Sequence, residues 1–279
     1  MSTLIDLHLH TKASDGLLSP SELVAFASAN GVGAIAITDH DTVAGVGEAL
    51  ERAAQAGIVC IPGIEFSVEH PASFHLLGLF VDHAHPGLVK RTEDLQRFRE
   101  NRAERMHADL AAHGIFIPYE DVIEEAGGAA IGKPHFARVL VKHGYAGSHD
   151  EVFTRFLEKG MPGYASKEKI LPEEALTLID QAGGIAVLAH PVSLQLGTGA
   201  EFEIVLRGLV DQGLRGIEVY ASMHADDEVR DLLALARKYN LLVSGGSDFH
   251  DNEETEMGYY GLSRPIPVEI LDPLMRAGG

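Results

Sequence analysis

The sequence predicts an α/β protein whose strands close into a distorted, seven-stranded TIM-like (β/α)7 barrel. Short apolar or β-branched runs alternate with helical patterns, which favours a parallel sheet. Seven such runs are enough to close a barrel, and an open doubly wound sheet is the alternative. The chain has 279 residues, of which 46% are hydrophobic, so it is long enough for one barrel with or without an insert and can bury a large core.

Each predicted strand is short and is bounded by turn or helix signals. In chain order the strands cover Thr3–His10, Gly33–Thr38, Ile58–Phe66, Phe74–Val81, Gly184–Ala189, Gly216–Tyr220 and Leu241–Ser247. Between them lie helices with recognisable starts. Ser19 is followed by Pro20 at the first helical position and by Glu22 three residues after the cap, which is typical of a helix N-terminus. Leu171–Glu174 and Ala225–Tyr239 follow similar patterns.

One region interrupts this alternation. From Arg91 to Ser166 the pattern is helical and contains no convincing strand, so the fourth and fifth strands are separated by far more than an ordinary connection. We therefore expect a discontinuous barrel, 1–90 and 167–279, with an inserted helical subdomain, 91–166, over its mouth. The alternative is a pair of helices without a functional role.

Composition excludes several classes of protein. The formal net charge of −19 argues against a basic face for duplex DNA, although bound divalent cations could still attract an anionic substrate. Cys60 is the single cysteine and lies in an apolar run, which predicts a buried, inert thiol and no internal disulfide. Asp6, His8 and His10 interrupt the apolar N-terminal stretch, and no run reaches the roughly 18 apolar residues of a membrane span. We therefore expect a cytoplasmic protein that does not bind membranes.

The first predicted strand carries a candidate metal-binding pair. In a strand, alternate side chains share a face, so His8 and His10 are expected to point together while Ile5, Leu7 and Leu9 pack on the other face. Two imidazoles placed in this way can chelate one ion, although the pair alone is a weak signal. Asp15, in the following loop, is compatible with a ligand or with a turn residue.

Other metal-ligating residue types recur at the ends of the predicted strands. His40 follows the second strand, Glu65 ends the third, His190 follows the fifth, and Asp248 and His250 follow the last. Because β/α barrels build their active sites at this end, the pattern predicts one metal centre. His75 is an exception, since it lies near the start of its strand. Mixed imidazole and carboxylate ligands suit Mn²⁺, Fe²⁺ or Zn²⁺, and the lack of cysteine ligands argues against a structural zinc site.

Taken in order, these motifs resemble those of the PHP family, named for polymerase and histidinol phosphatase. The motifs are HxH with a following Asp, TDH, GIE, an internal His, AHP and SDFH, and they cover roughly residues 1–90 and 167–262. The resemblance implies a distorted seven-stranded barrel with a trinuclear centre, most often of Mn²⁺, with Fe²⁺ or Zn²⁺ as alternatives. Carried over position by position, it implies a first ion held by His8, His10, Glu65 and Asp248, a second held by Glu65, His75 and His190, and a third held by Asp15, His40 and His250.

Such a centre implies hydrolysis of phosphoesters. Two ions about 3.5–4 Å apart can hold a hydroxide that attacks phosphorus, which is consistent with a bridging Glu65. We expect Asp248, His190 and His250 to take part in catalysis, and either histidine could protonate the leaving oxygen although both are also implied ligands. A further set of acids could orient ligand imidazoles or serve only as caps and core hydrogen-bond partners; these are Asp6, Asp39 and Glu218.

The helical insert offers candidates for substrate recognition. Arg102 and Arg105 are neighbours at i, i+3 on a predicted helix, and the later GKPHFAR segment supplies Lys133, Pro134, His135 and Arg138. Such donors could grip a second phosphate. The alternative is an ordinary charged helix face paired with Glu. The order of the motifs, with AHP downstream of an insert that contains GKPH, is similar to that in certain PHP members. Those members hydrolyse nucleoside 3′,5′-bisphosphates such as pAp and trim 5′-phosphorylated short RNA.

Three alternative functions remain open. Histidinol phosphate or another small monoester could be the substrate, or the chain could be a non-catalytic module like those of replicative polymerases, although no implied ligand position is substituted. An amidohydrolase also begins with HxH but fits the TDH and SDFH endings less well. The expected partners are a phosphorylated nucleotide and short single-stranded RNA, with no obligate protein partner. The remaining histidines are expected at the surface: His70, His83, His85, His107, His113, His143, His149 and His224.

Overall fold

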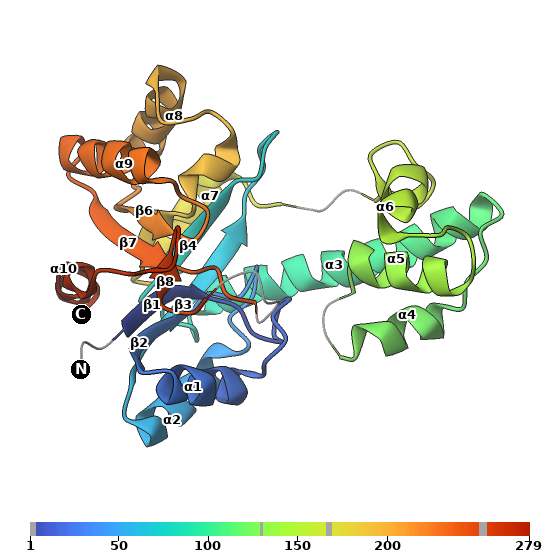
Figure 1. Ribbon diagram of the computed structural model, residues 1–279, viewed down its shortest axis with the longest axis horizontal. Coiled ribbons are helices and arrows are strands. Elements are labelled where there is room, and N and C mark those ends of the chain that lie inside the picture. Colours follow the sequence, from blue (N-terminus) through green and yellow to red (C-terminus); the bar gives the residue numbers. More distant parts are fainter. Residues whose placement is uncertain (1–3, 129–130, 166–168, 251–255) are drawn as a thin grey trace. The chain divides into compact units, whose positions relative to one another are not determined.

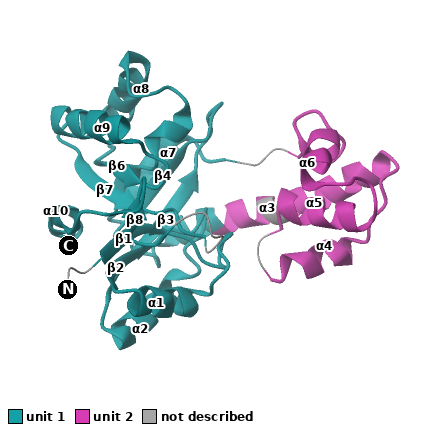
Figure 2. Cartoon of the chain, viewed as in Figure 1, with its two compact units in different colours: residues 1–92, 169–279 teal, residues 93–168 magenta. Residues whose placement is uncertain are grey.

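The structure is a computed structural model that describes residues 4–128, 131–165, 169–250 and 256–279 (Figure 1). The chain divides into two compact units, residues 1–92 with 169–279 and residues 93–168 (Figure 2). The first unit carries the strands, and the second is helical. The boundary predicted at residues 166–167 lies outside the described residues.

The first unit is built around a seven-stranded sheet in the order β1 to β7. Its strands are β1 Leu4–Leu9, β2 Val32–Ile37, β3 Val59–Ser67, β4 His75–Leu79, β5 Ile185–Leu188, β6 Gly216–Ala221 and β7 Leu242–Gly246. The segment that follows β7 returns to β1, where Leu9 and Phe249 form a parallel bridge and the Asp248 amide donates to the His8 carbonyl at 3.1 Å. The sheet therefore curls into a nearly closed barrel and is not an open doubly wound sheet. A separate two-stranded sheet pairs β8 Tyr259–Tyr260 with β9 Arg264–Pro265.

Strand β4 corrects the prediction of an all-parallel sheet, because it pairs antiparallel with both β3 and β5. A parallel strand needs a crossover of a dozen or more residues, and the connection between Ser67 and His75 is too short to provide one. The chain therefore turns back directly. As a result, the start of β4 lies at the end of the barrel where the parallel strands finish, and His75 is brought to the mouth of the barrel.

An irregularity in β1 corrects a second prediction. Asp6 pairs with Ile35 and Leu9 pairs with Ile37, so β1 contains one residue more than β2 over this stretch, as in a β-bulge. Ile5 and Leu7 pack in the same core cluster as Leu77, which shares a strand face with His75. Strict alternation had placed Ile5 and Leu7 on the face opposite the histidines. In the structure they instead lie on the face of β1 that points into the barrel. Because of the extra residue, His8 and His10 also face the barrel interior, nearer to its mouth than Ile5 and Leu7.

The helices of the barrel unit pack around the sheet (Figure 1). They are α1 Pro20–Ala29, α2 Val46–Ala56, α7 Pro172–Gln181, α8 Ala200–Asp211, α9 Asp226–Lys238 and α10 Leu271–Gly278, with 3-10 helices η2 Pro191–Leu194 and η3 Val268–Ile270. The predicted start of α1 is confirmed, since the Ser19 hydroxyl accepts from the Glu22 amide at 3.2 Å and the Glu22 carboxylate accepts from the Ser19 amide at 2.8 Å.

The end of the barrel remote from His8, His10 and His75 is filled by apolar side chains. Ile5, Leu7 and Leu77 join one buried cluster with Ile266 and Leu274 of the C-terminal segment. The C-terminal segment therefore packs against this end of the barrel, opposite the mouth.

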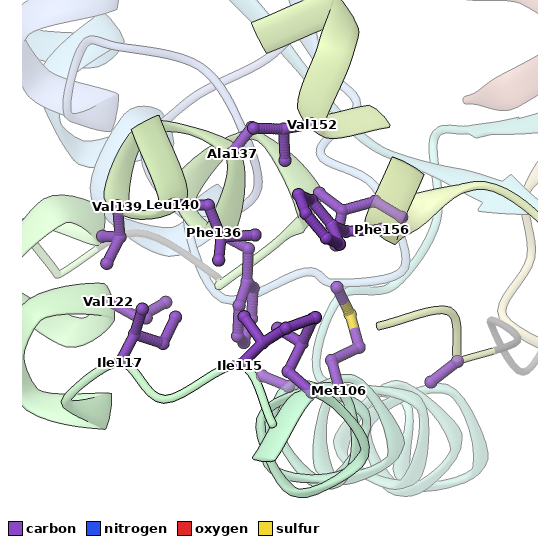
Figure 3. Packing of buried hydrophobic residues seen from close by; sticks show 14 residues of the cluster. Met106, Ile115, Ile117, Val122, Phe136, Ala137, Val139, Leu140, Val152 and Phe156 are labelled. Carbon is purple, nitrogen blue, oxygen red and sulfur yellow. The ribbon is translucent and has the colours of Figure 1, made fainter. Parts of the chain in front are cut away.

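The second unit has its own hydrophobic core (Figure 3). It contains most of α3 Pro86–Ala112, together with α4 Tyr119–Ala126, α5 Lys133–Lys142, α6 His149–Val152 and the π-helix η1 Phe153–Leu157. Met106, Val122 and Phe136 are buried together and come from three of these helices. Among the described residues, no helix is both long and apolar enough to cross a membrane.

Candidate metal centre

Glu65 lies at the centre of a group of buried and partly buried imidazoles. One of its carboxylate oxygens, Oε2, lies 2.9 Å from His40 Nδ1 and 3.3 Å from both His8 Nε2 and His10 Nε2. The other oxygen, Oε1, lies 2.9 Å from His75 Nδ1 and 3.1 Å from His190 Nε2. Both oxygens of one fully buried carboxylate are thus shared among imidazoles from four strands or strand ends, which is the arrangement a bridging ligand requires.

The side chains form three overlapping groups whose ligand atoms lie within 4.8 Å of one another. The groups are His8, His10, Glu65 and Asp248; His10, Asp15, His40 and His250; and His40, Glu65 and His75. His190 Nε2 lies 3.4 Å from His75 Nδ1 and so joins the third group at its edge. All the side chains that the sequence singled out as ligands are therefore gathered at one end of the barrel.

Several buried atoms of this cluster have no hydrogen-bond partner among the described residues. They are His8 Nε2, both ring nitrogens of His10, His40 Nδ1 and Glu65 Oε2. A buried polar atom without a partner costs free energy, and a protein seldom gathers five of them without a ligand to satisfy them. Imidazole nitrogens and carboxylate oxygens are together the donor set of first-row divalent cations. The residues present therefore fit a multinuclear metal centre.

Hydrogen bonds to the remote ring nitrogens orient two of the imidazoles. His250 Nδ1 lies 2.8 Å from the Asp248 carbonyl, which can only accept, so Nδ1 carries a proton and Nε2 is the nitrogen left to face the candidate metal site. Nε2 in turn lies 3.3 Å from Asp15 Oδ1. His8 Nδ1 similarly lies 3.1 Å from the Glu218 carboxylate, which leaves His8 Nε2 to face Glu65.

Of the three acids suggested as orienting groups, only Glu218 contacts a ligand imidazole. Besides His8, this fully buried carboxylate accepts from the His190 amide at 2.7 Å. Asp6 instead accepts from the Ser247 hydroxyl at 2.6 Å and from backbone amides. Asp39 accepts from the amide and hydroxyl of Thr11, both at 2.7 Å, and so shapes the loop after β1.

The charges of the cluster are strongly coupled. Burial alone would raise the pKa of the Glu65 carboxyl, but the surrounding imidazoles of His40, His8 and His75 outweigh it and hold the pKa well below its usual range. Burial would likewise lower the pKa of His40, whereas the carboxylates of Glu65 and Asp15 raise it to about 9. Glu65 is therefore ionised and available as a ligand across the neutral pH range.

Two residues of this cluster also have a strained backbone. His190 has φ 24° and Asp248 has φ 57°, both in the left-handed region that residues with a side chain rarely adopt. Such conformations cost free energy and persist only where the surroundings enforce them. In His190 the Glu218 carboxylate fixes the amide, and in Asp248 the amide donates to His8 of the neighbouring strand.

Two of the substrate-binding candidates in the helical unit are near each other. Arg102 is buried, and its Nε donates to the Ala165 carbonyl at 2.8 Å. Lys133 Nζ lies 4.8 Å from the centre of the Tyr164 ring. Burial, together with the positive charge of Arg102, lowers the pKa of the Lys133 ammonium. This unit therefore places the Lys133 ammonium beside an aromatic ring and near a second cationic group.

The other candidates in this unit have different surroundings. Arg105 and Pro134 are exposed, so Arg105 does not share the buried environment of Arg102 although the two are neighbours in sequence. His135 Nδ1 accepts from the Gly132 amide at 2.9 Å at the start of α5. Arg138 is paired with Glu125. This pairing is of the kind expected from the alternative interpretation of the insert, a charged helix face whose basic residues pair with Glu.

His224 was expected at the surface, and that prediction is wrong. Its side chain is 2% exposed, and Nδ1 donates to the Val219 carbonyl at 2.8 Å. His224 follows β6 directly, at the same end of the barrel as the ligands. Its position just after a strand is therefore the signal that could have separated it from the loop histidines.

Comparisons with known proteins show which proteins this chain resembles. The PHP domain family model matches residues 6–124. A 3′,5′-nucleoside bisphosphate phosphatase of Chromobacterium violaceum is 36% identical over 98% of this chain and 98% of its own length. A 5′-3′ exoribonuclease of Salmonella typhimurium is 37% identical over 89% of this chain and 86% of its own length.

Two solved structures share the fold of the whole chain. One, described as an amidohydrolase from Chromobacterium violaceum with bound sulfate and no metal, superimposes with a TM-score of 0.81 at 33% identity and covers 99% of this chain and 97% of its own. The other, described as a metal-dependent phosphoesterase from Bifidobacterium adolescentis, also has a TM-score of 0.81, at 27% identity, and covers 100% of this chain and 98% of its own.

Proposed function

Because this chain belongs to the PHP domain family and is a metal-dependent hydrolase of phosphoester bonds, we propose that it removes the 3′-phosphate from nucleoside 3′,5′-bisphosphates. The observation that carries the proposal is Glu65, whose two carboxylate oxygens face five imidazoles. The names of the two sequence relatives support a substrate with neighbouring phosphoryl groups at the 5′ and 3′ positions.

We propose three divalent ions, with Mn²⁺ as the expected metal. One would be held by His8, His10, Glu65 and Asp248, the second by Glu65, His75 and His190, and the third by Asp15, His40 and His250. When bound, the ions supply Lewis-acid stabilisation of the charge that develops on the phosphoryl oxygens. Glu65 would be a ligand of two of the ions, since each of its oxygens faces a different group of imidazoles.

Asp248, His190 and His250 keep their proposed place in catalysis as ligands that position the reacting phosphate. The Nδ1 proton of His250 is directed at the Asp248 carbonyl, so it is not available to a leaving oxygen while Nε2 serves as a ligand. This favours a source other than His250 for the proton that the leaving 3′-oxygen receives.

The second phosphate is proposed to bind to the basic groups of the helical unit. Lys133 is partly buried beside Arg102 and Tyr164, and its lowered pKa reflects a desolvated ammonium whose interaction with an anion is stronger than at the open surface. Arg105, Pro134, His135 and Arg138 complete the proposed substrate-binding set. Of these, Arg105 and Pro134 are exposed.

A panel of phosphate-release assays tests this proposal. Nucleoside 3′,5′-bisphosphates, the matching 3′- and 5′-monophosphates and histidinol phosphate would be compared at equal Mn²⁺. The bisphosphates should be cleaved fastest. Equal rates with monophosphates would refute the role of a second phosphate, and a preference for histidinol phosphate would support the alternative substrate.

Lys133→Ala should raise KM for bisphosphates by about 10- to 100-fold, as expected for the loss of one charge-assisted hydrogen bond, and should leave the monophosphates unaffected. Lys142→Ala is the matched control, because Lys142 is an exposed lysine at the other end of the same helix. An equal loss for both classes of substrate would argue against a phosphate-binding role for Lys133.

A second candidate substrate is short RNA with a 5′-phosphate, which the exoribonuclease relative supports. Such RNA also presents a 5′-phosphate followed by a 3′-phosphoryl group, so one site could serve both. Incubation with a 5′-phosphorylated trinucleotide and with its 5′-hydroxyl counterpart would test it. Cleavage restricted to the phosphorylated RNA is expected.

A further inference from the structure

We propose that Ser193 is a positioning residue that fixes the tautomer of His190, so that the Nε2 lone pair of His190 is presented to the second metal position. The inference rests on the proposed function only in so far as His190 is a ligand of that centre. Ser193 has no motif of its own, and it lies on η2, three residues after His190.

A chain of two hydrogen bonds determines where the protons lie. The Ser193 hydroxyl lies 3.0 Å from the Ser73 carbonyl, and because a carbonyl can only accept, the hydroxyl hydrogen is used there. Ser193 Oγ also lies 3.0 Å from His190 Nδ1. With its own hydrogen committed to Ser73, Oγ must accept, so Nδ1 carries the proton.

The consequence of this chain is seen at the other ring nitrogen. With Nδ1 protonated, Nε2 is the ring nitrogen left to face the proposed metal position, and it lies 3.1 Å from Glu65 Oε1 and 3.4 Å from His75 Nδ1. Ser73, whose carbonyl accepts the first of these two hydrogen bonds, lies two residues before His75. Ser193 therefore links the segment that carries one ligand to the ring of the other.

The backbone of His190 is fixed by separate contacts. Its amide donates to Glu218 at 2.7 Å, and its carbonyl accepts from the Ser193 amide at 3.0 Å, which holds the strained φ of 24°. Neither contact acts on the imidazole ring. The ring is 4% exposed, and within the described part of the chain the Ser193 hydroxyl is the hydrogen-bond partner of its Nδ1.

Removal of this hydroxyl should therefore weaken metal binding without unfolding the chain. In Ser193→Ala the Nδ1–H tautomer is no longer favoured, and the ring gains a second tautomer and rotational freedom that binding must suppress. Loss of a comparable partner of a metal-ligating histidine lowers metal affinity by roughly 10- to 100-fold. We expect this loss for one ion, with the remaining ions bound as in the wild type.

The first test measures Mn²⁺ binding by calorimetric titration and by metal analysis after dialysis, with the fold monitored by circular dichroism. Ser193→Ala should lose one tightly bound ion, and Ser193→Thr, which keeps the hydroxyl, should restore it. Thr198→Ala is the matched control, because Thr198 lies on the same connection and its hydroxyl bonds to Asp231 at 3.1 Å. Wild-type affinity for every ion in Ser193→Ala would overturn the inference.

The second test needs no variant at Ser193. In wild-type protein loaded with diamagnetic Zn²⁺, ¹⁵N shifts of labelled histidine rings distinguish protonated from metal-bound nitrogens, and His190→Gln identifies the His190 signals. A protonated Nδ1 and a metal-bound Nε2 are expected, and metal on Nδ1 would overturn the inference. A wild-type protein that binds no metal would refute both this inference and the proposed function, whereas normal wild-type binding with either negative result would refute the inference alone.

Discussion

At the scale of single residues, Glu218 connects two parts of the candidate centre. One of its oxygens accepts from the His8 ring and the other accepts from the His190 amide. Glu218→Gln keeps the shape of the side chain but replaces one acceptor with an NH₂ group that faces a donor. Because the site is fully buried, that repulsion cannot be relieved by water, and we expect Mn²⁺ affinity to fall by about 10- to 100-fold in calorimetric titration.

A surface carboxylate gives the control for this change. Glu203 on α8 pairs with Lys238 and accepts from the Tyr239 hydroxyl at 2.6 Å, and exposed pairs of this kind contribute little. Glu203→Gln should bind Mn²⁺ as the wild type does. If Glu218→Gln also bound Mn²⁺ normally, the carboxylate would be needed for neither imidazole orientation nor backbone geometry.

Cys60 illustrates the opposite case, a chemically distinctive residue without a reactive role. It lies on β3, where burial raises the pKa of its thiol to about 12. At pH 8 this leaves a thiolate fraction of about one in ten thousand, against roughly one quarter for a free cysteine. Because only the thiolate reacts, native protein at pH 8 should resist iodoacetamide, whereas urea-unfolded protein should be alkylated fully. Mass spectrometry measures both, and rapid labelling of the native chain would contradict the raised pKa.

The residues that the sequence identified are those whose chemistry is rare. Histidines and acids such as His40, Glu65 and His190 stand out because they recur at strand ends, and the structure gathers them. Ser193 could not be found in this way, because serine is common and its effect depends on the Ser73 carbonyl, which is distant in sequence. His224 was assigned to the surface because the burial of one imidazole depends on packing that no local pattern encodes.

At the scale of elements, the positions of the strands were predictable but their directions were not. Apolar runs mark a strand equally well whether it runs parallel or antiparallel, so β4 was expected to follow its neighbours. The position of His75 at the start of this run was the one visible sign of reversal. The bulge in β1 was similarly hidden, because one extra residue changes which face each later side chain occupies without changing the apolar pattern.

The closure of the barrel depends on Gly246, at the end of β7. A Cβ atom at this position would lie 2.2 Å from His8 Cβ and 2.6 Å from the His8 amide nitrogen. Gly246→Ala must therefore push β1 away from β7 and displace the His8 imidazole. We expect a loss of at least about 1–3 kcal/mol in the free energy of unfolding, measured by urea denaturation, together with weaker Mn²⁺ binding.

Gly208 supplies the matched control for this substitution. It lies within α8, and a Cβ atom there would meet no atom within 4 Å. Because alanine favours the helix over glycine, Gly208→Ala should raise the free energy of unfolding by about 0.5–1 kcal/mol and leave metal binding unchanged. A Gly246→Ala protein as stable as the wild type would show that β1 and β7 tolerate a wider separation than the structure indicates.

At the scale of the whole molecule, the two units have separate hydrophobic cores but different sources of stability. The helical unit is stabilised by apolar packing around Phe136 and Met106. The barrel unit also packs an apolar core, but its mouth holds buried ring nitrogens and a carboxylate oxygen that have no hydrogen-bond partner in the described part of the chain. Metal binding should satisfy these atoms, so we expect it to stabilise the barrel unit in particular.

Hydrogen exchange measured by mass spectrometry with and without Mn²⁺ tests this expectation. A ligand that binds only the folded state at a free concentration of 100 times its Kd adds about 2.7 kcal/mol to stability, which slows globally limited exchange by about 100-fold. Amides of β1, β3 and β5 should show this slowing. Amides of α5 should not, because their exchange depends on the opening of a unit that supplies none of the proposed ligands. Equal slowing in α5 would show that the two units unfold as one cooperative structure, and the separate cores would then not be independent in stability.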